Sequence, residues 1–354
     1  MYDVVIVGAG PAGSTLARLI GKKYKVLLLD RRELIEKQEV SLEKCCGGLI
    51  APDAQKMLAK LGLGVPQKVL VGPQLFTVRT LDLQQNIERY YQRHYINIDR
   101  EKFDRWLVSI LPPTVDVLGV TLFKKYHLEN GRYKIHFQNK GKKYTEETRC
   151  LIGADGAFSK VRRQIRPDFV QRTYISIQEW FQASDKQPYF SAIFDEETSD
   201  FYSWTIPKED SLILGATMLP KQNVTDKFQI LKKRLGKYGF KFENSIKKNG
   251  AFILRPVSTK QIYLGQGNLA LVGEAAGWIS PTSAEGLSYA FRSALALAKS
   301  IEKNPENLIG EYGKNTAKLR INILLKTFKE PFMYNPQLRK AIMKSGLLSM
   351  DIDA

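Results

Sequence analysis

Three glycines near the start of the chain have the spacing of a dinucleotide-binding loop. In the segment DVVIVGAGPAGSTL, Gly8, Gly10 and Gly13 follow a run of apolar, mostly β-branched residues. The first glycine makes a tight turn, the second lets the backbone approach a pyrophosphate, and the third lets a helix pack closely on the strand. Pro11 and Ala12 begin that helix, whose N-terminus attracts phosphate. The loop therefore predicts a bound dinucleotide.

A second apolar strand and its terminal acid extend this pattern. Residues 26–29 end at Asp30, which lies 22 residues after Gly8. A carboxylate at this distance accepts hydrogen bonds from ribose hydroxyls and disfavours a 2′-phosphate. We expect Asp30 and the adjacent Arg31 to contact the nucleotide. The motif by itself does not distinguish a nicotinamide from a flavin.

Three further segments place polar residues at strand ends or helix starts. Arg100 begins a helix from which it can reach a phosphate or ribose. The segment GADGAFSKVRR sets Asp155 and Gly156 between a strand and a helix. In LVGEAAG, a strand delivers Gly273 and Glu274 to the sheet edge, where the carboxylate can accept a hydrogen bond from a polyol. We expect all five residues to contact the dinucleotide.

A helix start further along the same segment bears on the chemistry. Gly286 and Leu287 begin a long helix after a turn at Pro281. The N–H groups and positive dipole of a helix N-terminus stabilise an anionic flavin ring, which favours its reduced form. This helix start therefore favours a flavin over a nicotinamide as the bound dinucleotide.

Taken together, these segments resemble the glutathione-reductase-type flavoproteins of the para-hydroxybenzoate-hydroxylase class. In that class GADG and a later G-D motif both contact FAD, the second at the ribityl chain. Here Glu274 stands where the class usually has Asp, so the acceptor is kept and its reach changes by one methylene. The resemblance implies that FAD is the bound dinucleotide.

Two more motifs resemble those of the geranylgeranyl reductase branch of this class. They are CGG (Cys46, Gly47, Gly48) and Y-x-W-x-I-P (Tyr202, Trp204), in which Ile206 replaces the usual Phe. In that branch the second motif lines the substrate cavity. The resemblance covers essentially the whole chain and is strongest to the bacterial CbrA-type proteins, which are assigned as FAD-binding. It implies that the CGG residues approach the flavin and that Cys46 also lines the cavity.

The reaction that the resemblance implies is reduction of a carbon–carbon double bond in a small, apolar, isoprenoid-like substrate. The flavin supplies the hydride, and the protein supplies orientation and electrostatics. Tyr202 is the candidate proton donor, Trp204 walls off the cavity, and Cys46 lines it. On spacing alone, Tyr202 and Trp204 fit equally well as the core of an aromatic strand.

Other functions stay open at this point. An FAD-dependent monooxygenase shares the fold and the cofactor contacts, a flavin-binding redox module needs no turnover, and a membrane- or nucleic-acid-associated protein can hold a structural flavin. The chain has a single G-x-G-x-x-G, so no second Rossmann domain is available for NAD(P)H. Electrons then come from transiently bound NAD(P)H or from another donor, such as a protein carrier or a quinol.

Composition narrows the partners and the compartment. The chain has 354 residues, 25% of them charged, and a net charge of +18. Its lysines and arginines are scattered and carry no recognition motif, which argues against nucleic acid. No residues have metal-ligand spacing, so no metal site is expected. Three cysteines and the lack of a signal-like N-terminus predict a cytoplasmic protein.

The C-terminal region mixes lysines and arginines with apolar residues at helical spacing. The apolar residues are Leu319, Ile323, Leu324, Leu325 and Phe328. A basic amphipathic helix of this kind either lies on anionic lipid or packs its apolar face on a core. Peripheral contact with the inner face of the membrane, and a lipid as substrate, are therefore among the expectations.

The elements that must position these residues form an α/β fold. We expect a discontinuous, Rossmann-like FAD-binding domain with an inserted antiparallel sheet for the substrate and helices at the C-terminus, because segments such as YISIQEWF and SLILGATM are typical of strands. The FAD-binding domain is expected at 1–66, 96–171 and 258–305. The substrate domain takes 67–95 and 172–257, and the helical region 306–354.

Overall fold

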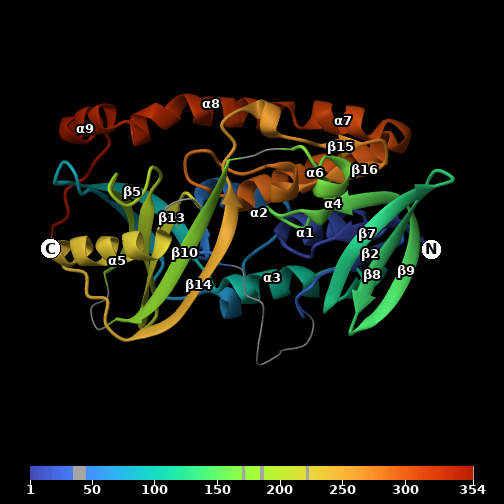
Figure 1. The fold of residues 1–354 in the computed structure, drawn as a ribbon, viewed down its shortest axis with the longest axis horizontal. Coiled ribbons are helices and arrows are strands. Elements are labelled where there is room, and N and C mark those ends of the chain that lie inside the picture. Colours follow the sequence, from blue (N-terminus) through green and yellow to red (C-terminus); the bar gives the residue numbers. More distant parts are fainter. Residues whose placement is uncertain (35–44, 170–171, 184–186, 221–222, 354) are drawn as a thin grey trace.

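The computed structural model describes residues 1–34, 45–169, 172–183, 187–220 and 223–353. It has an elongated shape with one large sheet in each half, and helices lie between and across the two halves (Figure 1). The expected fold class, a Rossmann-like half joined to a second sheet and to C-terminal helices, is confirmed.

The first sheet has a parallel centre and an antiparallel extension. Its parallel strands, in spatial order, are β16 (Leu269–Leu271), β9 (Lys142–Gly153), β1 (Tyr2–Val7), β2 (Val26–Leu29) and β6 (Val115–Leu118). The extension consists of β7 (Thr121–Glu129) and β8 (Arg132–Asn139), which pair antiparallel with each other; β8 also pairs antiparallel with the first half of β9. A short strand, β15 (Gly265–Gln266), pairs with β16.

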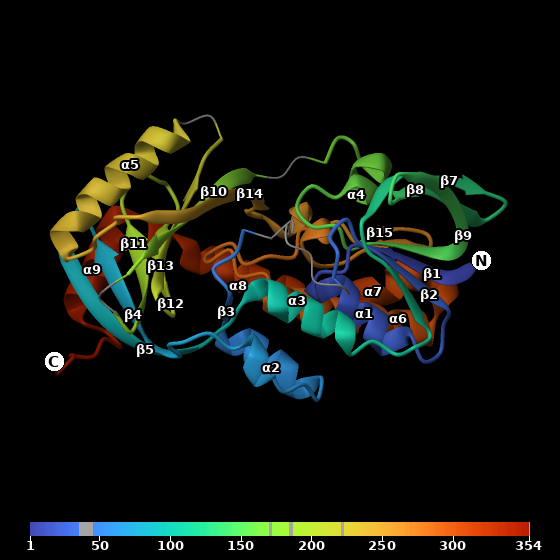
Figure 2. The ribbon, with the colours of Figure 1, turned by 90° about the horizontal axis from the view of Figure 1, so that it is seen from below.

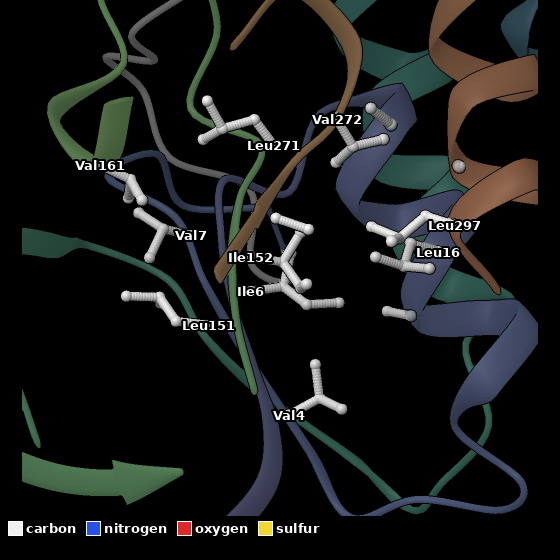
Figure 3. Packing of buried hydrophobic residues seen from close by; sticks show 14 of the residues in the cluster. Val4, Ile6, Val7, Leu16, Leu151, Ile152, Val161, Leu271, Val272 and Leu297 are labelled. Atoms are coloured by element: carbon white, nitrogen blue, oxygen red, sulfur yellow. The ribbon is translucent and has the colours of Figure 1, made fainter. Parts of the chain in front are cut away.

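Helices bury the parallel strands on both faces. They are α1 (Pro11–Ile20) and α6 (Leu287–Lys303) on one side and α4 (Lys160–Ile165) on the other. Leu16 and Leu297 from the first side, Ile6 and Ile152 from the strands, and Val161 from α4 belong to one buried cluster (Figure 3). This two-sided burial explains why β1 and β2 are continuous apolar runs.

The second sheet is larger and mostly antiparallel. Its spatial order is β14 (Ser245–Leu254), β10 (Thr173–Gln182), β13 (Ser211–Met218), β12 (Ser203–Lys208), β11 (Tyr189–Phe194), β4 (Leu75–Asp82), β5 (Ile87–Asn97) and β3 (Leu49–Ile50). The pair β4–β11 is parallel, whereas we expected an antiparallel sheet. The β4–β5 hairpin comes from a distant part of the chain, so no tight turn dictates its direction beside β11. The proposed domain boundaries stay predictions.

The two faces of the second sheet have different coverings because side chains alternate along each strand. One face packs Leu212 and Leu214 against Phe228 and Leu231 of α5 (Val224–Leu235). The other face carries Trp204, together with Ile206 and Ile213. The CGG motif contacts this second face, where Gly47 lies against Ile206.

The remaining helices lie around the two sheets, and one of them spans both halves. They are α2 (Pro52–Lys60), α3 (Arg100–Ser109), α7 (Leu308–Asn315), α8 (Ala317–Tyr334) and α9 (Pro336–Ser345). Helix α8 runs along the molecule from the first half to the second, and α9 continues over the second sheet (Figures 1 and 2). Within the described residues, no helix is both long enough and apolar enough to span a bilayer.

Buried ion pairs hold the two C-terminal helices on the second sheet. Arg339 of α9, 4% exposed, donates to Asp82 of β4 at 2.7 Å and to Glu196 at 3.1 Å. Arg255, which follows β14, pairs with Glu330 of α8 and is 2% exposed. Because each arginine pairs with a carboxylate away from water, removing one partner would leave the other as an unpaired buried charge and lower the stability of the fold.

We expect Arg339→Leu to lower the free energy of unfolding by about 3 kcal/mol, because it leaves the fully buried Asp82 carboxylate without its partner. Urea denaturation followed by circular dichroism measures this. Arg166→Leu is the matched control, since its ion pair with Asp168 is exposed and contributes less than about 1 kcal/mol. Equal losses in the two variants would contradict the buried pairing.

Candidate functional site

The parallel strands of the first sheet end in one row. Val7 pairs with Leu29 on one side and with Gly153 on the other, and Gly153 pairs with Leu271. In open α/β sheets, ligands bind outside the carboxyl ends of the strands. Four of the predicted residues lie one or two positions after these strand ends: Gly8, Asp30, Asp155 and Gly273.

The glycine loop is shaped by close backbone packing. Gly8 has φ +109°, and a Cβ on Gly13 would lie 1.9 Å from the Gly8 carbonyl oxygen. Pro11 and Ala12 are buried at the start of α1, and a Cβ on Gly273 would lie 2.8 Å from the Cβ of Ala12. The loop and the end of β16 therefore touch each other. No residue larger than glycine fits at positions 8 and 13 without moving the backbone.

Asp30 holds the loop rather than standing free at its edge. Its carboxylate accepts from the Ala9 N–H at 2.7 Å and from the Nε of Arg32 at 3.0 Å. The backbone N–H of Arg32 donates to the same carboxylate at 2.8 Å. Arg31, which we expected at the nucleotide, is exposed, and its neighbour Arg32 takes the contact with Asp30.

Asp155 presents an unpaired acceptor at the same edge. One carboxylate oxygen accepts from the backbone N–H groups of Lys160 and Val161 at 2.6 and 3.3 Å, capping α4. The other oxygen is buried and has no hydrogen-bond partner among the described residues. Burial raises the pKa of this carboxyl. A bound group with its own donors, such as a ribose or polyol hydroxyl, would satisfy that oxygen.

Open space adjoins the backbone at three of the predicted glycines. Within the described part of the chain, and apart from each glycine's own neighbours in sequence, no atom lies within 4 Å of the place that a Cβ would take on Gly10, Gly156 or Gly286. A dinucleotide needs such close backbone approach. The open backbone and the unpaired Asp155 oxygen therefore fit FAD.

The start of α6 differs from the expectation in one respect. Glu285 accepts from the N–H of Ser288 at 2.7 Å and from its hydroxyl at 2.6 Å, so a carboxylate already takes one N–H of the first turn. Gly286 is the N-cap, and Leu287 packs into a buried cluster. The positive end of this helix is therefore partly neutralised. Glu274 accepts from the Leu254 N–H at 3.3 Å and so contacts the end of β14.

The CGG motif packs directly on the second sheet. A Cβ on Gly47 would lie 2.4 Å from Cδ1 of Ile206 and 3.7 Å from Nε1 of Trp204. Gly48 has φ +64°, and a Cβ there would lie 2.3 Å from the Ile98 carbonyl oxygen. Both glycines are thus needed for close approach. The structure brings the two motifs of the resemblance into contact.

Tyr202 and Trp204 form one aromatic surface next to this contact. Their ring centroids are 5.5 Å apart, and the Tyr202 hydroxyl donates to the Ser283 carbonyl at 2.8 Å. Burial raises the pKa of Tyr202, so its phenol stays protonated at neutral pH. Trp204 pairs with Gly215, where a Cβ would lie 2.1 Å from the indole ring. Gly215 therefore makes the room for Trp204.

Comparison with known proteins identifies the family. Protein CbrA of Escherichia coli O9:H4 (strain HS) is 40% identical over 346 residues, which are 98% of this chain and 94% of that protein. The chain belongs to the CbrA family. No model of a protein family matches it.

Solved structures share the fold of this CbrA-family protein at low sequence identity. One is a geranylgeranyl bacteriochlorophyll reductase-like protein from Thermoplasma acidophilum, with a TM-score of 0.80, 19% identity, and coverage of 96% of this chain and 90% of that chain. Another is PqsL, a probable FAD-dependent monooxygenase from Pseudomonas aeruginosa, with a TM-score of 0.71, 16% identity, and coverage of 98% and 99%. These likenesses establish a common fold.

A buried chain of charges links the glycine loop of this CbrA-family protein to Cys46. Arg32 donates to Asp104 at 2.7 Å, Arg100 donates to the other oxygen of Asp104 at 2.9 Å, and Arg100 lies 3.3 Å from Sγ of Cys46. Burial alone would raise the pKa of the Asp104 carboxyl, but Arg100 and Arg32 hold it below its ordinary value. Since Arg32 also binds Asp30, one network spans both motifs.

Lys208 fixes the other side of the CGG motif. Its ammonium donates to the carbonyls of Gly48 and Ile98 at 3.1 and 2.7 Å, and to Oδ1 of Asn97 at 2.5 Å. Burial lowers the pKa of Lys208 to about 7. A pocket of about 250 Å³ lies between these groups; its lining includes Arg32, Cys46, Arg100, Asp104, Trp180 and Lys208.

Sequence reasoning missed four of the residues that shape the site. They are Arg32, Gln178, Lys208 and Gly215. Lys208 could have been predicted from the alternation of side chains along a strand, because it lies two residues after Ile206 and therefore on the same face. Gln178 faces the same region through Gly215, and its buried Oε1 makes no hydrogen bond among the described residues. Only the pairing of strands reveals Gly215.

We expect Gly10→Val to fold normally and to bind FAD at least about tenfold more weakly, the loss that accompanies one hydrogen bond to a charged group. The backbone at Gly10 is extended, and no described residue other than its chain neighbours lies within 4 Å of its Cβ position, so we expect a side chain there to meet the ligand. Isothermal titration with FAD measures the change. Gly64→Val is the control, because its Cβ also enters open space far from the loop. Undiminished FAD binding by Gly10→Val would contradict this placement.

We expect Lys208→Met to flatten the pH dependence of stability between pH 7 and 9. The unfolded chain keeps a proton on this lysine up to its ordinary pKa of 10.5, whereas the folded chain releases it above about 7. The wild-type free energy of unfolding therefore rises with pH in this window, by roughly 1 kcal/mol per pH unit from this group. Urea denaturation at pH 7, 8 and 9 measures the slope. The exposed Lys143→Met is the control, and a slope unchanged in Lys208→Met would refute the assignment.

Proposed function

We propose that this protein is an FAD-dependent oxidoreductase that reduces a carbon–carbon double bond of an apolar, isoprenoid-like substrate. The observation that carries the proposal is the contact of Gly47 with Trp204 and Ile206. It joins the edge that fits a dinucleotide to an aromatic sheet face, through Cys46 and Arg100. A reductase needs those two surfaces next to each other.

Residues of the first half would hold the cofactor. The backbone from Gly8 to Gly13 fits the pyrophosphate, and the unpaired Asp155 oxygen can accept a hydroxyl of the ribose or ribityl chain. Asp30 positions the loop through Ala9. FAD, when bound and reduced, supplies the hydride, and the protein supplies orientation and electrostatics.

Residues of the second sheet would hold the substrate. Trp204 and Ile206 cluster with Leu75, and Tyr95 and Phe190 pack against them. Leu75, Ile206 and Trp204 are themselves buried, so the partly buried rings of Tyr95 and Phe190 would offer the apolar area that binds hydrocarbon. The fold shared with a geranylgeranyl bacteriochlorophyll reductase-like protein supports an isoprenoid chain as the occupant.

Tyr202 is the group best placed to deliver the proton. Its hydroxyl is buried beside Trp204 and remains protonated at neutral pH. In this structure it donates to the Ser283 carbonyl, so that hydrogen bond must break before the phenol can give its proton to a substrate carbon. Cys46, held 3.3 Å from Arg100, lines the adjoining pocket and keeps the CGG backbone in place.

A flavin monooxygenase is the second candidate, favoured by the fold shared with PqsL. The two reactions differ in their use of oxygen. Oxygen uptake that matches substrate turnover identifies a monooxygenase, whereas anaerobic reoxidation of the flavin by a prenyl substrate identifies a reductase. NAD(P)H, bound transiently, is proposed as the electron donor, with a protein carrier or a quinol as the alternative; stopped-flow reduction of the flavin by each tests this.

We expect Tyr202→Phe to slow anaerobic reoxidation of the dithionite-reduced flavin by a prenyl alcohol or prenyl diphosphate by about 10²-fold, because it removes only the proton donor. Trp204→Ala should impair the same step through lost cavity shape while leaving FAD bound. Flavin absorbance during stopped-flow mixing measures both.

Tyr144→Phe is the control for Tyr202→Phe, since Tyr144 is 44% exposed and lies in the first half of β9, where it pairs with β8. Normal reoxidation by Tyr202→Phe would assign the proton to solvent. Loss of FAD from Trp204→Ala would instead place this strand at the cofactor.

A further inference from the structure

Helix α8 carries apolar side chains on two opposite faces. Leu319 and Ile323 are buried, at 5% and 0% exposed, and pack into the core of the first half. On the opposite side lie five exposed apolar residues, here called the outer stripe: Ile321 (56%), Leu324 (46%), Leu325 (55%), Phe328 (67%) and Phe332 (52%). Elsewhere in the described chain, no helix exposes more than one large apolar side chain.

The outer stripe follows the helical repeat. At about 100° per residue, its members fall within a sector about 100° wide that is centred opposite Leu319 and Ile323. A helix that only covers a core has polar residues on its solvent side. The outer side of α8 is therefore built to contact something apolar.

The charges around the stripe are cationic. Lys318 and Lys329 are exposed and lie at one border of the stripe. The single acid of α8 is Glu330, whose carboxylate pairs with the buried Arg255. Helix α9 adds Lys340 and Lys344 and has no acid at all. An occupant of this face must accept apolar side chains at its centre and supply negative charge at its edge.

We propose that the outer stripe of α8 docks this protein on an anionic lipid bilayer, with the helix lying in the plane of the interface. Phe328, Leu325 and their neighbours enter the acyl region, and Lys318 and Lys329 bind the lipid phosphates. A second copy of the chain fits less well, because it would bring its own lysines against these lysines. The net charge of +18 adds a general attraction to anionic membranes.

The inner side of the same helix contacts the loop next to the candidate site. Tyr334, in the last turn of α8, donates to the Thr282 carbonyl at 2.5 Å. The next residue, Ser283, accepts from Tyr202. Docking through α8 therefore brings the loop beside Tyr202 close to the bilayer. The lipid proposal itself rests on the surface of α8 and not on the proposed reaction.

Vesicle cosedimentation of the full-length protein tests the proposal without any substrate. The parent should bind vesicles of phosphatidylglycerol and phosphatidylcholine, and bind pure phosphatidylcholine much less. Leu325→Ser with Phe328→Ser should lower the partition coefficient by about tenfold or more, because two large side chains no longer enter lipid. Lys318→Glu with Lys329→Glu should lower it by about tenfold or more and reduce its dependence on NaCl concentration.

Matched double variants provide the controls. Leu128→Ser with Ile246→Ser removes two apolar side chains that are each 62% exposed, on β7 and β14. Lys142→Glu with Lys143→Glu makes the same change of charge on exposed residues of β9. Both should bind vesicles like the parent, and circular dichroism should show all four variants folded.

Three results would overturn the proposal. One is full vesicle binding by the Leu325 and Phe328 double variant, and another is an equal loss in the controls. The third is concentration-dependent self-association of the parent in sedimentation velocity, abolished by the same double variant, without vesicle binding; that result would assign the stripe to a second copy. None of these results depends on whether the protein reduces a double bond.

Discussion

The buried pair of arginines on Asp104 is the interaction on which both candidate surfaces depend. Asp104 is 1% exposed and would be costly to bury alone, but Arg32 and Arg100 each donate to one of its oxygens. Arg32 carries the connection on to Asp30 and the glycine loop, and Arg100 carries it on to Cys46. Loss of Asp104 would leave Arg100 without a carboxylate partner among the described residues, and loss of either arginine would leave one buried oxygen of Asp104 without its donor. The loop, α3 and the CGG motif are therefore held as one unit.

The second sheet contacts this unit because side chains alternate between the two faces of a strand. Alternation places Trp204, Ile206 and Lys208 on one face of β12, and pairing with β13 sets Gly215 opposite Trp204. Gly47 can then approach the indole, and Lys208 can reach the carbonyl of Gly48. An aromatic wall, a small residue behind it and a lysine at its end thus come from two adjacent strands, without any long loop.

Local patterns predicted those parts of the site that depend on contiguous residues. The glycine loop, Asp30, Asp155 and Gly273 could be predicted to lie at one edge of the sheet because strand, turn and helix follow one another in the sequence. Gly215, Arg32 and the parallel pair β4–β11 were missed, since each depends on which distant segment arrives beside it. Arg31 was predicted to contact the nucleotide because nothing in the local sequence distinguishes it from the adjacent Arg32. Only the fold shows that Arg32 is the one that binds Asp104. We expected the N–H groups at the start of the helix after Gly286 to face the flavin. One of them, the N–H of Ser288, instead donates to Glu285, which caps the helix.

Helix α8 shows how composition and structure answer different questions. The sequence presents Leu319, Ile323 and Phe328 as equivalent apolar residues among lysines, and both a core and a membrane can account for that. The fold separates them, because Leu319 and Ile323 complete the core while Phe328 lies 67% exposed on the far side. A helix that must satisfy a core on one side has no need of apolar residues on the other. Their presence there, beside lysines and on the side of the helix away from its one acid, is what the proposed contact with lipid would explain.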